Sequence, residues 1–440
     1  MNTKEVQKPR YINVHCHLLN FEFLPDSFFG NCGVPESFIK SRFTIFLIKL
    51  IKPYLLLRNK IKGYLPLYLI DTCISNLKRE ITEIRKIYSA EMYQAKFILA
   101  TPLMMDVEIA SSRQKPECPY RLQIQIISEL VAKRYFWELE YFIMMPFIMF
   151  DPRREIENFK FPAAEMMARD AIKKAIEDYG FLGVKMYPAL GYHPDPESIY
   201  NPESVNKELR EIYKYCDKNR IPITTHCSRD GAYSSELIRS RQSVKFLSSP
   251  LYWEKVLNDY PDINLNLAHF GGGWDFLRKD DRDFESWTRE ILKLMKKYKN
   301  VYADVSSHSG ALMSKISNNY FKDIYRDFEF DPKQIKKVNN KEYFKILNCL
   351  LDDESYRYKI LFGTDWPMTR HSWYEKTYVQ FFIDGLGKDN FEQIALKNPL
   401  KFLFPEDKVP ERIEKFHKEN ECGKEAINWL NTEMEKLRKN

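Results

Sequence analysis

The sequence predicts an α/β protein built as a (β/α)8 barrel, and three observations lead to this fold class. Eight short apolar or β-branched runs follow one another along the chain and alternate with segments of helical periodicity. Several of the runs are nearly all apolar and do not alternate, as expected for parallel strands buried on both faces. No stretch rich in proline, glycine or serine divides the 440 residues, so a single domain over residues 1–440 is expected.

The expected strands are short and can be placed in chain order: Tyr11–His17, Phe97–Met105, Tyr141–Phe150, Gly183–Tyr187, Ile221–Cys227, Ile263–Phe270, Val301–Ser306 and Ile360–Asp365. Between them, apolar residues recur every three or four positions and so share one helical face. Three such faces are Leu77, Ile81, Ile84 and Tyr88; Val205, Leu209, Ile212 and Cys216; and Phe284, Trp287, Ile291 and Leu294.

The length beyond a barrel falls into two insertions, about residues 18–70 and 310–358, and a charged helical tail, about residues 406–440. The first insertion contains the apolar run Phe43–Leu57, which Lys49, Lys52 and Pro53 interrupt. A membrane-spanning helix needs about 20 mostly apolar residues, so this run is too short. Two interpretations stay open: a lid that packs over the barrel, or an amphipathic helix that rests on a membrane surface.

The composition is that of a globular chain with a substantial core, at 44% hydrophobic and 29% charged residues. The net charge of +7 is spread along the chain without a dense basic block, which argues against a nucleic-acid partner. Eight cysteines occur singly without a CxxC pair, and no secretory leader is visible, so a cytoplasmic location is expected. A homo-oligomeric state stays an open alternative, but no pattern in the sequence indicates an interface.

Candidate site residues gather at the carboxyl ends of the expected strands, where barrel enzymes place their chemistry. The first strand ends in His15-Cys16-His17, and residues i and i+2 of a strand point the same way. His226, His269 and Asp365 end three later strands, and Gly271–Gly273 follow His269. Imidazole nitrogens together with a carboxylate suit a divalent metal, with Zn²⁺ preferred and Mn²⁺ or Fe²⁺ as alternatives.

These markers resemble the amidohydrolase superfamily, in the branch that holds metal-dependent hydrolases and decarboxylases similar to aminocarboxymuconate-semialdehyde decarboxylase. The resemblance extends from about Tyr11 to about Pro405. Its markers are INVHCH at 12–17, GVKMYP at 183–188, THC at 225–227, AHFGGG at 268–273, GTDWP at 363–367 and NPLKFLF at 398–404.

The resemblance implies roles for these residues. His15, His17, His226 and Asp365 would bind one metal ion, and His269 would hold or polarise the attacking water or a substrate oxygen. Asp365 would also act as general base and proton shuttle. A divalent ion lowers the pKa of a bound water from 15.7 to about 7, which agrees with such a role.

Lys185 and Asn13 are the two ambiguous positions. In some branches a lysine on this strand is carbamylated and bridges two metals, whereas here one ion is preferred, with Lys185 as a cationic or proton-donating group or as a packing residue. The resemblance implies an aspartate where Asn13 stands, so a charge beside the site is lost without the loss of a ligand.

Loop residues that could contact a small-molecule substrate are Tyr187, His193, Arg229, Trp274, His308 and Arg370, unless they serve only in packing. The two arginines would suit a carboxylate or a phosphate. The leading function is metal-dependent hydrolysis of an amide, ester or lactone. The alternatives are a metal-dependent decarboxylase of an aromatic or unsaturated acid, and a non-catalytic barrel associated with a membrane surface.

Overall fold

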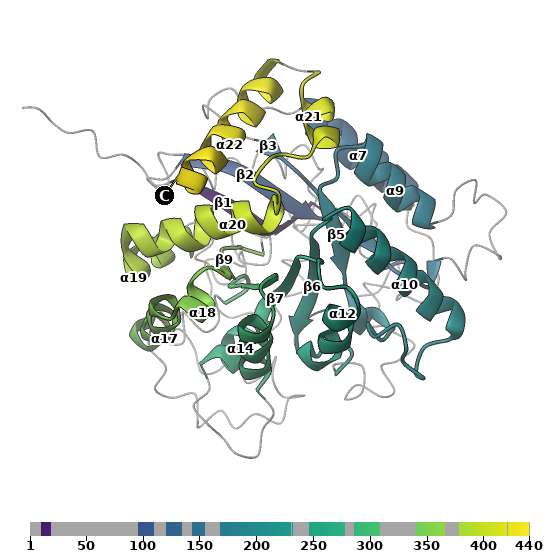
Figure 1. Ribbon diagram of the computed structural model, residues 1–440, viewed down its shortest axis with the longest axis horizontal. Helices are drawn as coiled ribbons and strands as arrows, with labels where there is room; N and C mark the ends of the chain where they lie inside the picture. The colour runs from purple at the N-terminus through teal and green to yellow at the C-terminus, as the bar shows by residue number, and fades with distance from the viewer. Residues whose placement is uncertain are drawn as a thin grey trace, which may run out of the picture.

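The strands form one parallel sheet whose spatial order follows the chain order, β1-β2-β4-β5-β6-β7-β8-β9, as expected for a (β/α)8 barrel. Figure 1 shows this computed structural model with the helices arranged around the strands. The structure describes residues 10–18, 96–109, 120–133, 143–154, 168–229, 231, 246–277, 286–308, 340–365, 378–419 and 421–439. The strands are β1 Arg10–His17, β2 Lys96–Leu103, β3 Ile143–Met144, β4 Phe147–Phe150, β5 Gly183–Met186, β6 Ile223–Ser228, β7 Leu265–Gly271, β8 Val301–Asp304 and β9 Ile360–Leu361.

The expected third strand, Tyr141–Phe150, is divided into β3 and β4. Proline has no backbone N–H to give to a strand ladder, and Pro146 lies at the break. The Met145 backbone N–H still bonds to the carbonyl of Ala100 at 2.9 Å, which keeps the broken strand beside β2. The sequence therefore predicted the place of this strand but not its interruption.

Three backbone hydrogen bonds join β1 to the segment that follows β9. The Val14 N–H donates to the carbonyl of Phe362 at 3.1 Å, and the N–H groups of Thr364 and Asp365 donate to the carbonyl of His15 at 3.1 and 2.8 Å. The two ends of the sheet thus meet where the candidate histidines and Asp365 lie, so the contacts that join β1 to this segment also bring the candidate residues together.

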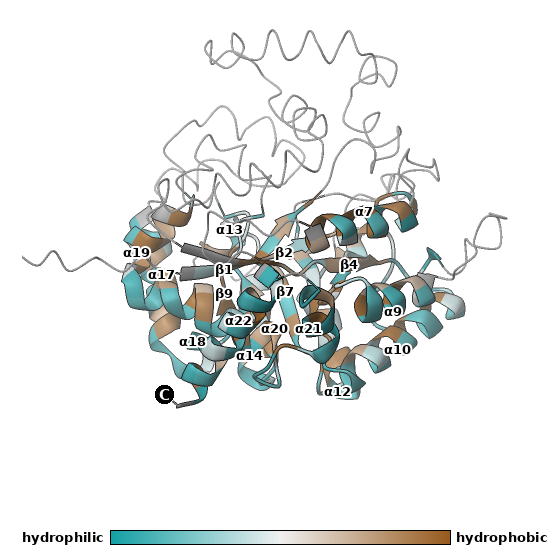
Figure 2. Ribbon diagram, turned by 90° about the horizontal axis from the view of Figure 1, so that it is seen from above, coloured by the Kyte–Doolittle hydropathy of each residue, from teal (hydrophilic) through white to brown (hydrophobic). Residues whose placement is uncertain are grey.

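The helices form an outer layer whose apolar faces rest on the strands. On α10, the predicted face of Val205, Leu209, Ile212 and Cys216 is fully buried, and each buried aliphatic side chain contributes about 1.5–3 kcal/mol. Figure 2 shows both hydrophilic and hydrophobic residues on α9 and α10, as a helix with one packed face requires. The helices are α7 Tyr120–Lys133, α9 Ala168–Asp178, α10 Glu203–Lys218, α12 Trp253–Asp259, α13 Gly273–Phe276, α14 Trp287–Lys297, α17 Asn340–Asp352, α18 Glu354–Arg357, α19 Tyr378–Glu392, α20 Asn398–Leu403, α21 Glu411–His417 and α22 Glu421–Lys439.

The structure confirms the helical tail, where α21 and α22 bury Ile413, Ile427 and Leu430. The described end of the second insertion is also helical, in α17 and α18. Residues 19–70, with the run Phe43–Leu57, and residues 310–339 lie outside the described residues, as do the helical face 77–88 and Phe284. The lid and membrane-surface interpretations therefore stay predictions. Within the described ranges, no helix is long and apolar enough to span a membrane.

Candidate metal centre

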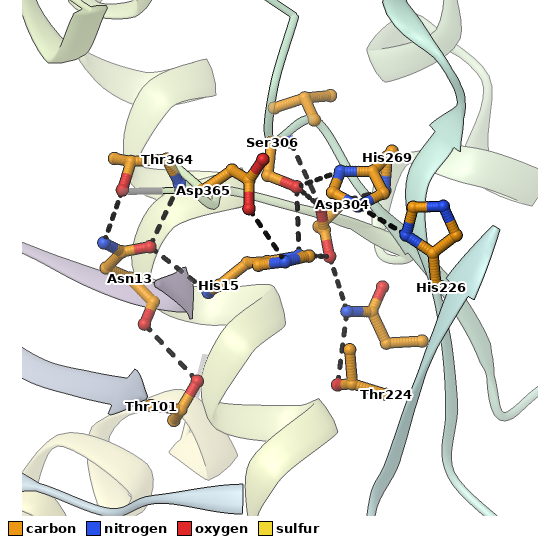
Figure 3. A network of polar contacts seen from close by, with 12 residues as sticks. Asn13, His15, Thr101, Thr224, His226, His269, Asp304, Ser306, Thr364 and Asp365 are labelled. Atoms are coloured by element: carbon orange, nitrogen blue, oxygen red, sulfur yellow. Dashed lines mark hydrogen bonds and ion pairs between the residues drawn. The ribbon is translucent and has the colours of Figure 1, made fainter. Parts of the chain in front are cut away.

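Three side chains predicted as metal ligands, His15, His17 and Asp365, converge at the carboxyl end of the barrel, and Figure 3 shows His15 and Asp365 turned toward each other. His17 Nε2 lies 3.0 Å from Asp365 Oδ1, and His15 Nε2 lies 3.4 Å from the same oxygen. Potential ligand atoms of these three buried residues all lie within 4.8 Å of one another. The structure therefore brings the two histidines of β1 together with Asp365, the residue that follows β9 and bonds back to β1.

The local sequence around Asp365 is suited to this close approach. A Cβ atom on Gly363 would lie 2.6 Å from the Cβ of His15, so only glycine lets this segment pass over β1. Asp365 itself has a φ of 56°, a left-handed conformation that aspartate adopts more readily than most residues. These two features place the carboxylate against the histidines.

Asp304, at the end of β8, determines which nitrogen of His15 carries the proton. Its Oδ2 accepts from His15 Nδ1 at 3.1 Å and from Asn266 Nδ2 at 2.7 Å. Its Oδ1 accepts from the backbone N–H groups of Ser306 at 3.0 Å and His269 at 3.2 Å, and from the Ser306 hydroxyl. Because an ionised carboxylate only accepts, His15 carries its proton on Nδ1 and keeps a lone pair on Nε2.

The same accounting applies to His17, whose Nδ1 donates to the carbonyl of Leu103 at 2.9 Å and whose Nε2 therefore also bears a lone pair. The buried His15 Nε2 makes no hydrogen bond within the part of the chain that the structure describes. Three electron-pair donors thus face one another across 3.0–3.4 Å. A divalent cation, or a proton on one imidazole, would stabilise this arrangement, so the residues present fit a metal ion.

His226 and His269 form a second pair beside this group. His269 Nδ1 lies 2.9 Å from Ser306 Oγ, and His269 Nε2 lies 3.1 Å from His226 Nδ1. Since Ser306 gives its only proton to Asp304, it accepts from His269, whose Nε2 in turn accepts from His226 Nδ1. The remaining His226 nitrogen, Nε2, then carries a lone pair, although His226 is outside the group formed by His15, His17 and Asp365.

Burial and the neighbouring charges set the pKa values of the centre. Burial lowers the pKa of His269 to about 3, assisted by His15, and also lowers the pKa of His17 despite Asp365. The pKa of His15 is raised, because Asp304 and Asp365 together outweigh the effect of its burial. Burial would raise the pKa of Asp365, yet the imidazoles of His15 and His17, whose Nε2 atoms lie 3.4 and 3.0 Å from its Oδ1, bring it well below its usual range.

Lys185 and Tyr187 extend from β5 toward the centre. Lys185 is buried, and burial lowers its pKa to about 8 although Asp304 and Asp365 oppose the shift. Its Nζ lies 5.6 Å from the centroid of the Tyr187 ring. That ring stacks on His226 at 4.1 Å between centroids. Tyr187 therefore lies between His226 and the ammonium group of Lys185.

The other predicted substrate contacts differ in their surroundings. Arg229 Cζ lies 4.5 Å above the Trp287 ring, and Trp274 packs partly buried against the core. His193 Nδ1 accepts from the backbone N–H of Asp195. Arg370 lies outside the described residues.

His308 is fully buried, and its side chain is held within the protein. Its Nδ1 lies 2.7 Å from the Tyr343 hydroxyl, and its Nε2 lies 2.7 Å from the carbonyl of His269. Neither ring nitrogen is available to a substrate in this arrangement, so the position of His308 favours support of the site over substrate contact.

Asp304 and Ser306 are the residues that the sequence interpretation missed. A signal was present, since Asp304 is a carboxylate at the end of the apolar run Val301–Val305. The rule that selected the histidines, polar residues at carboxyl ends of buried strands, selects Asp304 equally. Ser306 follows two residues later and becomes recognisable only through its contacts.

Asn13 ties β1 to the segment that closes the barrel. Its Oδ1 accepts from the backbone N–H groups of His15 at 3.2 Å and Thr364 at 3.1 Å. Its Nδ2 donates to Thr364 Oγ1 at 2.9 Å. The amide therefore performs the orienting role expected beside a metal site, without the charge of the aspartate that the resemblance implies.

The fold and the donor set define a parallel barrel with candidate metal ligands at the carboxyl ends of its strands. The family described as Amidohydrolase matches residues 159–404, more than half of the chain, and the protein belongs to it. The matched range contains Lys185, His226, His269 and Asp365, whereas His15 and His17 precede it. A comparison with curated proteins gives no match.

Three solved structures have a similar course of the chain at low identity. An uncharacterized TIM-barrel protein from Bordetella bronchiseptica is 13% identical, with a TM-score of 0.47 over 90% of this chain and 98% of its own. A Lactobacillus casei protein assigned as a metal-dependent hydrolase is 14% identical, with a TM-score of 0.46 over 91% and 96%. Dihydroorotase from Saccharomyces cerevisiae, in complex with 5-fluoroorotic acid, is 12% identical, with a TM-score of 0.39 over 75% and 81%.

Proposed function

We propose that this protein is a metal-dependent hydrolase that acts on an amide, ester or lactone carbonyl of a small organic substrate. One observation carries the proposal: His15, His17 and Asp365 turn three electron-pair donors toward one another in a buried place. A bound divalent ion, Zn²⁺ most readily and otherwise Mn²⁺ or Fe²⁺, would supply an activated water and polarise the carbonyl. His226 would complete the ligand set through its Nε2.

The chain's own residues have distinct tasks in this proposal. Asp365 is ionised at neutral pH because its pKa is low, as a general base must be before it accepts a proton. It could then return that proton to the leaving group. His269 stays neutral because its pKa is about 3, and its Nε2 could hold a water by accepting a hydrogen bond in place of the one from His226 Nδ1. Lys185 and Arg229 would attract a carboxylate on the substrate.

A second reaction, decarboxylation of an aromatic or unsaturated acid, is supported by Lys185. Its buried ammonium has a pKa of about 8, so the group is protonated at neutral pH and could deliver a proton to carbon. The two reactions differ in products. Incorporation of oxygen from ¹⁸O-labelled water indicates hydrolysis, and release of carbon dioxide indicates decarboxylation.

The metal content of the purified full-length protein tests the centre directly. Mass spectrometry on protein prepared without chelator or His-tag should give about one equivalent per chain, as for a single catalytic ion. His15→Ala and Asp365→Ala should lose the ion, whereas His417→Phe, which changes a buried histidine of α21, should retain it. About two equivalents would favour a carbamylated Lys185 bridging two ions. No metal after reconstitution with Zn²⁺ or Mn²⁺ would refute the proposal.

A further inference from the structure

The segment that carries His269 has an unusual backbone. Its four consecutive residues have positive φ angles: 67° at His269, 48° at Phe270, 84° at Gly271 and 107° at Gly272. Glycine adopts such angles freely, but each non-glycine residue in this region costs about 1 kcal/mol or more. The surroundings must therefore hold His269 and Phe270 in place.

Side chains from neighbouring elements do hold this segment. The His269 carbonyl accepts from His308 Nε2 and from the backbone N–H of Gly272, each at 2.7 Å. The His269 N–H donates to Asp304 Oδ1 at 3.2 Å. The Phe270 carbonyl accepts from Thr288 Oγ1 at 2.9 Å. The contact from His308 is a side-chain donor to His269, the residue whose ring faces the centre.

The contacts of His308 determine which of its ring nitrogens carries the proton, and two of them come from helices outside the centre. A carbonyl can only accept, so His308 carries its proton on Nε2 and Nδ1 is an acceptor. The Tyr343 hydroxyl of α17, 2.7 Å away, donates to that Nδ1. The His308 backbone N–H donates to the Tyr378 hydroxyl of α19 at 3.3 Å. Loss of the Tyr343 hydroxyl would remove the donor to Nδ1, so that only the His269 carbonyl would still favour the tautomer with its proton on Nε2.

We propose that His308 is a positioning residue for His269, and that Tyr343 holds His308 in the tautomer which performs this task. The proposal rests on the role of His269 in the proposed function. In this proposal α17, which is part of the insertion after β8, helps to position His269 through Tyr343 and His308. His308 then acts on the reaction through His269 and not through contact with substrate.

Histidine-selective ¹⁵N labelling of the full-length protein gives a test that needs no substrate. The ring signals of the eight histidines report tautomer and environment, and a His269→Gln spectrum identifies His269. Tyr343→Phe removes one hydroxyl and should shift the signals of both His308 and His269. Tyr213→Phe removes an equally buried hydroxyl that donates to the Pro194 carbonyl at 2.8 Å, and it should leave both sets unchanged. Unaltered His269 signals in Tyr343→Phe and in His308→Leu would overturn the proposal.

Kinetics with the substrate found for the wild type give the second test. His308→Leu should lower kcat about tenfold, the size of effect expected when one buried hydrogen bond to a positioned group is lost. KM and the metal content should stay within twofold. His308→Gln keeps a side-chain N–H donor and should restore kcat to within about threefold of wild type. Equal losses in His308→Leu and His308→Gln would indicate packing alone and contradict the proposal.

The two tests separate the possible failures. If no substrate is turned over and no metal is bound, the proposed function fails, while the ring signals of His269 still judge the role of His308. If the wild type hydrolyses its substrate but His308→Leu has normal kcat and normal His269 signals, only the positioning role is refuted. Should His308→Leu not fold, the Tyr343→Phe variant decides alone, because phenylalanine preserves the packing of that ring.

Discussion

Replacement of Asp304 by asparagine should weaken metal binding strongly while it leaves the barrel folded. The carboxylate has two kinds of contact, with three donors on Oδ1 and with His15 and Asn266 on Oδ2. An amide would keep its oxygen toward the three donors and turn its NH₂ group toward His15 and Asn266. Asn266 can adapt, because its Oδ1 is buried without a hydrogen bond to any described residue and can accept after an amide flip.

His15 can adapt to the new amide only by a change of tautomer that weakens metal binding. To accept from the new amide it must move its proton from Nδ1 to Nε2, the nitrogen that faces His17 and Asp365. We therefore expect Asp304→Asn to lower the free energy of unfolding by only about 1–3 kcal/mol, the cost of one altered buried hydrogen bond. The affinity for Zn²⁺ should fall by about 10–100-fold or more, as for other residues that orient metal-bound histidines.

Competition with a chromogenic chelator measures the affinity, and chemical denaturation of the metal-free protein measures the stability. Asp275→Asn is the matched control. It is another buried aspartate, and its Oδ2 accepts from Ser286 and Thr288 while its Oδ1 makes no hydrogen bond within the described ranges. The control should bind metal as the wild type does. Normal metal affinity in Asp304→Asn would refute the tautomer argument.

Three further changes have defined outcomes. Gly363→Ala places a Cβ 2.6 Å from the Cβ of His15 and should destabilise the protein by about 1–3 kcal/mol while it lowers the metal content, both measurable on one preparation. Asn13→Asp should cost less than about 1 kcal/mol, because the Thr364 hydroxyl can rotate to donate to the new carboxylate; a large drop in the thermal midpoint would contradict this. Burial lowers the pKa of His417 to about 3, so its contribution is complete above pH 6.5 and is lost as the pH falls toward 3. When the pH falls from 6.5 to 5, the free energy of unfolding of His417→Phe should therefore decrease by about 2 kcal/mol less than that of the wild type. Denaturation at the two pH values measures this difference.

The sequence predicted the barrel well because its strands are buried on both faces, which makes several of them nearly continuous apolar runs. The same property concealed the break at Pro146, since the residues on both sides of it remain apolar. The end of Ile360–Asp365 was also less regular than expected, because only Ile360–Leu361 pairs as a strand and the rest turns across β1. The apolar pattern of a sequence predicts which residues are buried. Where a strand ends depends instead on its hydrogen bonds to the neighbouring strands.

The candidate centre could be predicted as a set of residues but not as a network. His15, His17 and Asp365 were found because strand ends of a barrel meet at one face. The tautomers of the histidines depend on contacts with Asp304, Ser306 and Leu103, which the register of separate strands creates. A sequence of one chain contains the residues of such contacts but not their pairing.

The raised pKa of His15 leads to a last prediction, since a proton and a metal ion compete for the same lone pair. The proton on His15 stabilises the metal-free protein fully below pH 6.5, and this contribution is lost as the pH rises through the raised pKa. A metal ion must displace that proton, so the affinity for Co²⁺ should rise about tenfold per pH unit below the raised pKa and level off above it. Titration of the metal-free protein with Co²⁺ at several pH values measures this slope, with one proton released per ion in weakly buffered solution. An affinity that does not change with pH would mean that His15 Nε2 is not a ligand, and the centre would then have to be built without the first histidine of β1.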